Sequence, residues 1–230
     1  MNYFYAPPQQ WINQHEVEIF GQEAQHIIKV LRYNVGDTIH IANGEGKIYE
    51  CEINSVSKQK LTAILGTFVE EEVPELAKVL ALGVIRIRDR FEFAIEKAVE
   101  LGATEICIFS ADHTERTKIN EDRLKLLIVS AFKQSGRFWL PDLVVLKSLD
   151  QVYKYYDDFD FIMAHEETSL TNRTDILSND SVLMVGPEGG FSERELTLNK
   201  NNAGEFISLG KNRLRAETAV TALLSQYLFS

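Results

Sequence analysis

Few residues of this chain are of the kinds that bind metals or form cross-links: of 230 residues, two are cysteine and five are histidine. Cys51 and Cys107 lie far apart, each in an apolar run typical of a strand, and neither belongs to a metal-ligand or redox motif. We expect both to be buried free thiols. The histidines also lack ligand spacing, so no metal site is predicted. They are His15, His26, His40, His113 and His165.

Long apolar runs and a basic leader are also missing. No run approaches the length of a membrane-spanning helix, and the first residues lack a basic stretch followed by an apolar core. We therefore expect a cytoplasmic protein with no membrane partner. Basic residues are also fewer than acidic ones: 24 lysines and arginines and 34 aspartates and glutamates give a net charge of −10. Electrostatics alone therefore does not indicate a nucleic-acid binder.

Residues 1 to about 70 are rich in short strands. Apolar and polar side chains alternate there with a period of two, and Asn43-Gly44 is a strong hairpin signal. The alternating stretches are 17–20, 38–41, 47–53 and 61–68. One helix is predicted over 23–31. This pattern favours a small β-barrel, and the acidic stretch that ends in Pro74 indicates a linker.

After Pro74 the pattern changes to strands that alternate with helices, which favours a mainly parallel sheet covered on both faces. Asp89 with Glu92 and Ser148 are predicted to cap helices at their starts, and Gly102 is predicted to end the first one. The predicted strands are 79–85, 105–109, 143–146, 159–164, 182–185 and 205–209. The predicted helices are 89–101, 123–134, 148–156, 193–201 and 216–229.

A glycine-rich turn, residues 186–190, follows the strand 182–185. Ser192 and Glu195 after it form a capping box that begins the next helix. The end of a parallel strand is where open α/β sheets bind ligands, and the glycines allow a ligand to approach the backbone closely. Taken alone, the pattern is as typical of a structural turn as of a ligand-binding one.

Two further stretches follow strands of the same expected sheet, residues 165–167 and 209–219. Because carboxyl ends of parallel strands share one edge, the three stretches are expected to converge. The second contains Arg215 and Glu217 at the start of the last helix. An acid that favours a helix start beside an unrelated surface arginine is the plainer interpretation of those two residues.

These stretches resemble those of the RsmE family, bacterial 16S rRNA uridine N-3 methyltransferases of the SPOUT class. The resemblance rests on Gly186-Pro187-Glu188-Gly189-Gly190-Phe191-Ser192 combined with Leu209-Gly210-x-x-x-Leu214-Arg215-Ala216-Glu217-Thr218-Ala219. It extends to stretches upstream, so that it covers nearly the whole chain. These are Asp89-Arg90-Phe91-Glu92, 96–103, Glu115-Arg116, Ala131-x-x-Gln134-Ser135-x-Arg137, and His26-x-x-x-Val30-Leu31-Arg32 with Gly36-Asp37.

The resemblance implies an α/β protein with a PUA-like RNA-binding β-barrel over 1–70 and a SPOUT domain with a deep trefoil knot over 75–230. It implies a homodimer in which the partner subunit completes each active site. The cofactor that it implies is S-adenosylmethionine, and the partner that it implies is 16S rRNA or the small ribosomal subunit. The residues implied to line the cofactor site are Ala164, His165, Glu166, Gly186, Glu188, Gly190, Leu209, Gly210 and Leu214.

The uracil N-3 is a poor nucleophile until it loses its proton, so a nearby cation that stabilises the resulting charge is expected. Arg215 is our candidate for this catalytic role, because its planar fork suits a carbonyl oxygen. We assign Glu217 to holding Arg215 or accepting the proton, and Thr218 to orienting either group. The arginines expected to contact RNA are Arg32, Arg88, Arg116 and Arg137.

Two other functions stay open at this point: a SPOUT methyltransferase that acts on another RNA position, and a non-catalytic RNA-binding assembly factor with a degenerate cofactor pocket. The intact glycine turn and the stretch 214–218 disfavour degeneration. A nicotinamide-dependent oxidoreductase would need a G-x-G-x-x-G turn after its first strand, which the sequence lacks.

Overall fold

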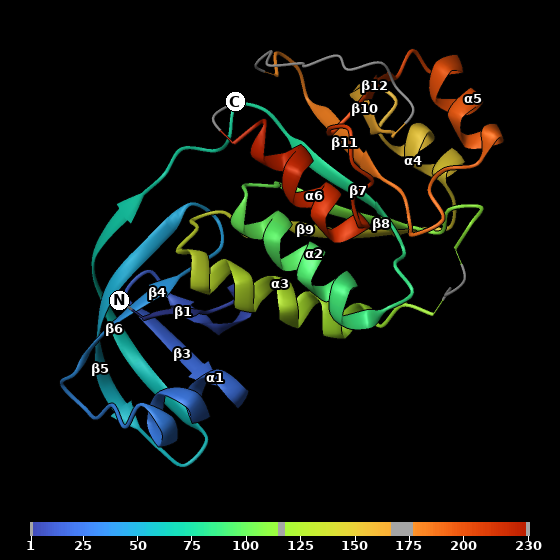
Figure 1. Ribbon diagram of the computed structural model, residues 1–230. Coiled ribbons are helices and arrows are strands. Elements are labelled where there is room, and N and C mark those ends of the chain that lie inside the picture. Colours follow the sequence, from blue (N-terminus) through green and yellow to red (C-terminus); the bar gives the residue numbers. More distant parts are fainter. Residues whose placement is uncertain (1, 115–117, 167–176, 229–230) are drawn as a thin grey trace. The chain divides into compact units, whose positions relative to one another are not determined.

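The computed structural model describes residues 2–114, 118–166 and 177–228 (Figure 1). The chain divides into two compact units. The first comprises Met1–Val73 together with Phe132–Leu140, and the second comprises Pro74–Ala131 together with Pro141–Ser230. Each unit is described by itself below.

The first unit is built on a six-stranded sheet with the order β1-β4-β5-β6-β3-β2. Its central strands pair antiparallel, whereas β1 pairs parallel to β4. The strands are β1 (Tyr3–Tyr5), β2 (Trp11–Asn13), β3 (Glu16–Phe20), β4 (Thr38–Ala42), β5 (Lys47–Val56) and β6 (Lys60–Glu70). The outer strands β1 and β2 do not pair with each other in the described chain, so the sheet is open at its edges rather than a closed barrel.

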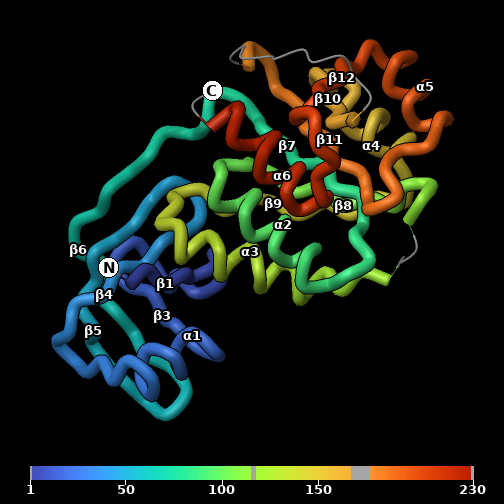
Figure 2. The backbone as a smooth tube through the Cα atoms, viewed as in Figure 1, coloured from blue at the N-terminus to red at the C-terminus, as the bar shows by residue number. Residues whose placement is uncertain are grey.

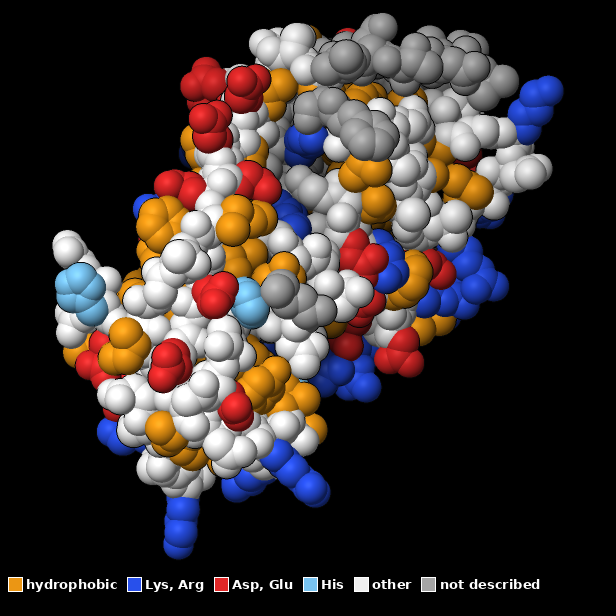
Figure 3. Space-filling model, turned by 90° about the vertical axis from the view of Figure 1, so that its left-hand side faces the viewer, with side chains coloured by type: hydrophobic (Ala, Val, Ile, Leu, Met, Phe, Trp, Pro, Cys, Tyr) orange, Lys and Arg blue, Asp and Glu red, His pale blue; other side chains and the backbone are white. Residues whose placement is uncertain are grey.

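Period-two alternation explains the core of this unit. Ile39 and Ile41 on β4 face the same side as Val17 and Ile19 on β3, and all four are buried. Other hydrophobic side chains reach the surface among polar ones, as Figure 3 shows for one face. The predicted helix over 23–31 is in two parts, the helix α1 (Gly21–Gln25) and a π-helical turn over His26–Val30.

The segment Phe132–Leu140 packs within the first unit, which the sequence does not indicate. The Phe132 ring meets that of Tyr5 edge-on, with centroids 5.8 Å apart, and the Lys133 ammonium lies 2.7 Å from the Glu23 carboxylate. Trp139 donates its indole N–H to the carbonyl of Glu71 at 3.1 Å. These contacts hold a stretch from later in the chain against the strand-rich unit.

The second unit has a parallel six-stranded sheet with the order β12-β10-β11-β7-β8-β9. The strands are β7 (Lys78–Gly83), β8 (Glu105–Phe109), β9 (Asp142–Leu146), β10 (Asp160–Ala164), β11 (Ser181–Val185) and β12 (Glu205–Ile207). The helices are α2 (Arg88–Glu100), α3 (Glu121–Ser135), α4 (Leu149–Tyr155), α5 (Glu193–Asn201) and α6 (Ala216–Ser225). The predicted alternation of strands and helices is confirmed.

Helices cover both faces of this sheet. On one face, side chains of α4 and α5 share a buried cluster with alternate residues of the strands, such as Val79, Ala81 and Met163. On the other face lie α2, α6 and the first part of α3 (Figure 1). Figures 1 and 2 show α6 running beside α2, and the two helices pack directly against each other. Burial on both faces explains why the central strands β7, β8, β10 and β11 are apolar after a polar first residue.

Helix starts agree with the sequence in one place, agree in part in a second and differ in a third. The Ser192 capping box is confirmed, because its hydroxyl accepts the Glu195 N–H while the Glu195 carboxylate accepts the Ser192 N–H. The predicted Asp89 cap is wrong: the N-cap of α2 is Ile87, with no side-chain bond, because Glu92 instead accepts from Arg123 at 2.8 Å. Ser148 is the N-cap residue of α4, as predicted, but its hydroxyl makes no capping bond.

Candidate functional site

The three turns expected to converge follow three strands that are neighbours in the second sheet. The strands β12, β10 and β11 pair in that order and run parallel, so their carboxyl ends lie at one edge. The N–H of His165, just after β10, donates to the carbonyl of Ile207, the last residue of β12, at 3.0 Å. The strand order thus brings residues 165–166, 186–190 and 209–216 to one place.

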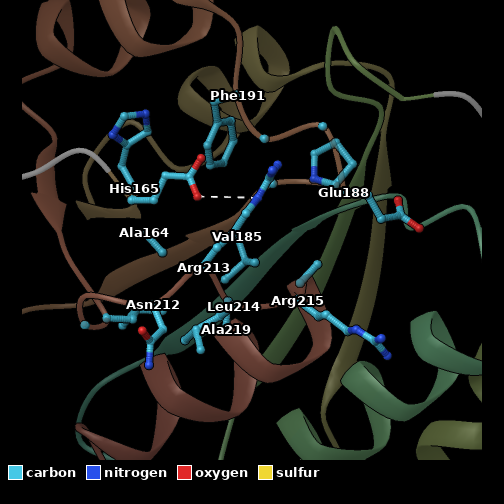
Figure 4. Close-up of a pocket in the computed structure, with 18 of the residues that line it drawn as sticks. Ala164, His165, Val185, Glu188, Phe191, Asn212, Arg213, Leu214, Arg215 and Ala219 are labelled. Carbon is cyan, nitrogen blue, oxygen red and sulfur yellow. Dashed lines mark ion pairs between the residues drawn. The ribbon is translucent and has the colours of Figure 1, made fainter.

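A cavity of about 510 Å³ opens between these turns (Figure 4). His165 and Phe191 lie at one end of the view, and Leu214, Arg215 and Ala219 at the other. All nine residues that the sequence placed around a cofactor line this cavity: Ala164, His165, Glu166, Gly186, Glu188, Gly190, Leu209, Gly210 and Leu214. The sequence missed other lining residues, among them Arg90, Val185, Phe191, Asn212 and Arg213.

Bare backbone faces the cavity at two glycines. Gly190 has a φ of +68° and donates its N–H to the Pro187 carbonyl at 2.9 Å, which closes the turn. Gly210 has a φ of +130°. Residues with a side chain rarely adopt such φ angles, and a Cβ added at either glycine would meet no atom within 4 Å. A ligand can therefore lie directly against peptide groups at both places.

A network of polar side chains supports the glycine turn 186–190 on the side away from the cavity. The buried Glu195 carboxylate accepts from the backbone N–H of Asp112 at 3.1 Å, and a ring nitrogen of His113 lies 3.0 Å from the Gly189 carbonyl oxygen. Arg194 donates to both Asp112 oxygens at 2.8 and 2.9 Å, and the Ser192 hydroxyl donates to one of them at 2.6 Å. These donors, Arg194 first, lower the pKa of Asp112 to about 2.

Charged side chains of both signs surround the cavity. Arg213 lies 3.5 Å from the Glu166 carboxylate, the ion pair that the dashed line in Figure 4 marks, and both side chains are exposed. The Glu188 carboxylate accepts the backbone N–H of Arg86 at 3.1 Å. Arg215, at the start of α6, takes part in no described ion pair, so its charge is available to an incoming ligand.

Of the three residues predicted to be catalytic, only Arg215 lines the cavity. It is the N-cap residue of α6 and is exposed. Thr218 is exposed on the first turn of the same helix and lies outside the lining. The Glu217 carboxylate lies 3.5 Å from Nε of Arg90, a residue of α2, and among the described contacts none joins it to the Arg215 guanidinium. The contact that the structure gives Glu217 is therefore with a residue that the sequence did not select.

One signal in the sequence pointed to Arg90. It lies in the Asp89-Arg90-Phe91-Glu92 motif, a few residues after the carboxyl end of β7, at the same edge of the sheet as the three turns. Its position within a helix concealed it, because the sequence signals for a ligand site lie in the turns that follow strands.

The arginines predicted to contact RNA do not form one group. Arg32, in the first unit, is exposed with a φ of +60°. Arg88, in the second, is 57% exposed and lies 3.7 Å from the Glu92 carboxylate. Arg137 belongs to the first unit and is half-buried, and burial lowers its pKa to about 10 although nearby Glu71 acts in the opposite direction. Arg116 lies outside the described residues.

Within the ranges 2–114, 118–166 and 177–228, no three or more His, Cys, Asp or Glu side chains are grouped so as to hold a metal ion. No helix in those ranges is long and apolar enough to cross a membrane. Cys51 and Cys107 are free and buried, as predicted.

Known proteins resemble this chain over most of its length. The family profile of an RNA methyltransferase PUA domain matches residues 21–66, and that of an RNA methyltransferase domain matches residues 72–228. The ribosomal RNA small subunit methyltransferase E of Bacillus subtilis is 31% identical over 223 residues, which cover 90% of this chain and 87% of that protein. The protein of the same name from Rickettsia conorii is 30% identical over 222 residues, 92% of this chain and 88% of its own.

A solved structure agrees with these matches. The crystal structure of a ribosomal RNA small subunit methyltransferase E from Neisseria gonorrhoeae, bound to S-adenosyl methionine, is 25% identical in sequence. It superimposes with a TM-score of 0.84 over 98% of this chain and 95% of that one. Both the strand-rich unit and the parallel-sheet unit are thus found together in a solved relative.

Proposed function

This chain belongs to the RNA methyltransferase family that includes ribosomal RNA small subunit methyltransferase E, and we propose that it methylates N-3 of a uridine in 16S rRNA with S-adenosylmethionine as methyl donor. The observation that carries the proposal is the cavity at the carboxyl ends of β10, β11 and β12. Three separate stretches of chain form it, and two of them, 186–190 and 209–216, carry motifs of the family.

The cavity fits S-adenosylmethionine in size and in the kind of surface it offers. About 510 Å³ lies within the usual range of small-molecule sites, roughly 300–1,000 Å³. Gly190 and Gly210 leave peptide groups bare against the space, as a flat adenine and a ribose require. The residues that we propose hold the cofactor are the nine predicted ones, Ala164, His165, Glu166, Gly186, Glu188, Gly190, Leu209, Gly210 and Leu214.

When bound, S-adenosylmethionine supplies a methyl group that is already activated on a positively charged sulfur. The chain has to hold the uracil ring in line with that methyl group and stabilise the negative charge left when N-3 loses its proton. Arg215 is exposed at the cavity and close to no described carboxylate, so its guanidinium is available to a carbonyl oxygen of the base. Thr218, on the same turn of α6, is proposed to orient the base or the arginine.

The target base has to be presented outside a stack, which favours a single-stranded or loop segment of the RNA. We propose that the PUA-like first unit binds the flanking RNA. Arg32, Arg88, Arg116 and Arg137 remain the proposed contacts to phosphates. The exposed position of Arg32 and Arg88 supports this role, while the partial burial of Arg137 leaves less of its guanidinium available to RNA.

Three further properties belong to the proposal through the family. They are a deep trefoil knot in the second unit, which brings separate turns to one cofactor, a homodimer whose partner subunit completes each site, and a cytoplasmic location, where ribosomal RNA is modified. The adjacency of the turns after β10, β11 and β12 supports the first of these, because a knot would pass through this region.

Mass mapping of ribosomal RNA from a deletion strain tests the proposed function. We expect one uridine of 16S rRNA to lose a methyl group in the deletion strain and to regain it when the wild-type gene is returned. A returned Arg215→Ala gene should leave the uridine unmethylated. Loss of methylation at another base or in another RNA would contradict the assignment, and calorimetry that detects no S-adenosylmethionine binding would favour a non-catalytic factor.

A further inference from the structure

Arg90 lines the cavity and also contacts a mostly buried side chain of the second unit, Glu217. It stands in the first turn of α2, which packs against α6, and its side chain is one of those that line the cavity. The side chain is 33% exposed, so part of it is covered and part remains accessible. It approaches the cavity from the α2 side, whereas Arg215 approaches from the start of α6.

Glu217 forms an ion pair with Arg90 from outside the cavity lining. Its side chain is only 13% exposed, and its Oε1 lies 3.5 Å from Nε of Arg90. Glu217 is absent from the cavity lining, and its Oε2 is buried without a hydrogen-bond partner among the described residues. Burying a charged carboxylate away from water costs free energy, and a nearby cation offsets part of that cost. The ion pair with Glu217 therefore restricts where the Arg90 guanidinium can lie.

The other arginines of the cavity are held differently. Arg213 pairs with Glu166 where both side chains are more than half exposed, a setting in which an ion pair contributes little to position. Arg215 pairs with no carboxylate in the described chain. Arg90 is thus the cavity arginine that a mostly buried carboxylate orients, and because the contact uses Nε, its two other nitrogens can donate elsewhere.

We propose that Arg90 is a second substrate-contacting arginine, positioned by Glu217, whose guanidinium donates to a carbonyl oxygen of the target uracil. This inference rests on the proposed function. It also gives Glu217 a different role from the one predicted: it positions Arg90 instead of holding Arg215 or accepting the proton itself.

The chemistry of uracil explains why two arginines serve better than one. N-3 lies between two carbonyl groups, and when its proton passes to water the negative charge spreads to both oxygens. One guanidinium for each oxygen stabilises that charge more than a single one can. Cytosine has an amino group in place of one carbonyl and no proton on N-3, so the same pair of donors disfavours it.

Arg90→Gln and Glu217→Gln test the proposal, with Arg123→Gln as the matched control. Arg123 also pairs with a glutamate, Glu92, but lies outside the cavity lining. With small-subunit RNA as substrate, we expect Arg90→Gln to lower kcat about 100-fold or more, the usual effect of losing one donor to a developing anion. Calorimetry should give an unchanged affinity for S-adenosylmethionine, and Arg123→Gln should behave as wild type in both measurements.

The double variant reports how the two residues are connected. If Glu217 acts through Arg90, Glu217→Gln lowers kcat less than Arg90→Gln does, and combining the two lowers it no further than Arg90→Gln alone. Arg90→Lys, which keeps the charge without the planar fork, should recover part of the loss. Thermal unfolding of every variant shows whether a loss of kcat reflects a loss of folding.

Several outcomes overturn the inference. A tenfold weaker affinity of Arg90→Gln for S-adenosylmethionine with kcat unchanged at saturation would assign Arg90 to the cofactor. Multiplying losses in the double variant would show that Glu217 acts independently of Arg90. Wild-type protein that binds the cofactor and RNA but transfers no methyl group would refute the proposed function itself, a result distinct from an active wild type with an equally active Arg90→Gln.

Discussion

Arg215 is exposed at the wall of the cavity, and no described carboxylate forms an ion pair with it. Loss of its guanidinium should therefore affect a charge that appears during the reaction. We predict that Arg215→Ala lowers kcat by about 100- to 1,000-fold and changes the affinity for S-adenosylmethionine little. The measurements are methyl transfer to small-subunit RNA and calorimetry.

Lys211→Ala is the control for this variant, because Lys211 is an exposed cation of the same loop that lies outside the cavity lining. It should retain wild-type turnover. Full turnover by Arg215→Ala would remove this arginine from the mechanism.

Asp112 should make the protein sensitive to acid. Hydrogen bonds from Arg194 and Ser192 lower its pKa from 3.8 to about 2 in the folded protein. A carboxylate whose pKa is lower when folded contributes stability above pH ~4, and that contribution disappears as the pH falls toward 2. We predict that the free energy of unfolding falls more steeply between pH 4 and pH 2 in wild type than in Asp112→Asn. Equal slopes would contradict the prediction, and high salt should reduce the difference because the pair is partly exposed.

At the scale of single residues, the sequence predicted what the backbone dictates better than what the side chains do. The glycines of the turn and the residues after each strand line the cavity because strand order alone places them there. Arg90 and its contact with Glu217 depend on how α2 packs against α6, which no local pattern encodes. For the same reason the partner of Glu217 could not be predicted.

The helix α5 shows how one element fixes the glycine turn before it. Ser192 caps the helix through the Glu195 N–H and also donates to Asp112, so its hydroxyl serves both the helix and the network behind the turn. We predict that Ser192→Ala lowers the free energy of unfolding by about 1 kcal/mol or somewhat more, because a capping bond and a bond to a charged acceptor are both lost. Denaturant unfolding measures this.

Thr197→Ala provides the comparison within the same helix. Thr197 is exposed in the middle of α5, where alanine favours the helix, so this variant should be as stable as wild type or slightly more stable. If Ser192→Ala were equally neutral, the capping box would not be holding the start of α5.

Among the elements, all six strands of the second unit were predicted, whereas the short outer strands β1 and β2 of the first unit were not. The strands of the second unit form continuous apolar runs because both faces are buried, and this pattern needs no knowledge of their partners. β1 and β2 have three residues each, too few to show an alternation. The cap predicted at Asp89 failed because Glu92, its expected capping-box partner, pairs with Arg123 instead, a long-range contact that the local sequence does not reveal. Ser148 has the predicted N-cap position in α4 but makes no capping bond.

For the whole molecule, we predict a homodimer in solution. Sedimentation equilibrium at micromolar concentration should give about twice the chain mass of 26.2 kDa. If the partner subunit completes each site, methyl transfer per chain should fall on dilution below the dissociation constant of the dimer, while the fold of each chain persists. A monomer with full activity would contradict both statements.

At this scale the sequence predicted two parts of different character, a strand-rich one and one with alternating strands and helices. The change of pattern at Pro74 marks where the chain first passes between the two units. It does not reveal that Phe132–Leu140 returns to the first, since the segment begins as the last residues of an ordinary amphipathic helix, α3, which ends at Ser135. Contacts such as that of Trp139 with Glu71 join residues far apart in sequence and leave no periodic trace.

That return has a consequence for anyone who wishes to rebuild the protein. The chain passes between its units at 73–74, at 131–132 and at 140–141, so the strand-rich unit is not one continuous stretch of sequence. Transplanting it into a relative requires two stretches of sequence to be exchanged together. A chimera joined at residue 74 alone would take the segment Phe132–Leu140 from one parent and the sheet against which it packs from the other.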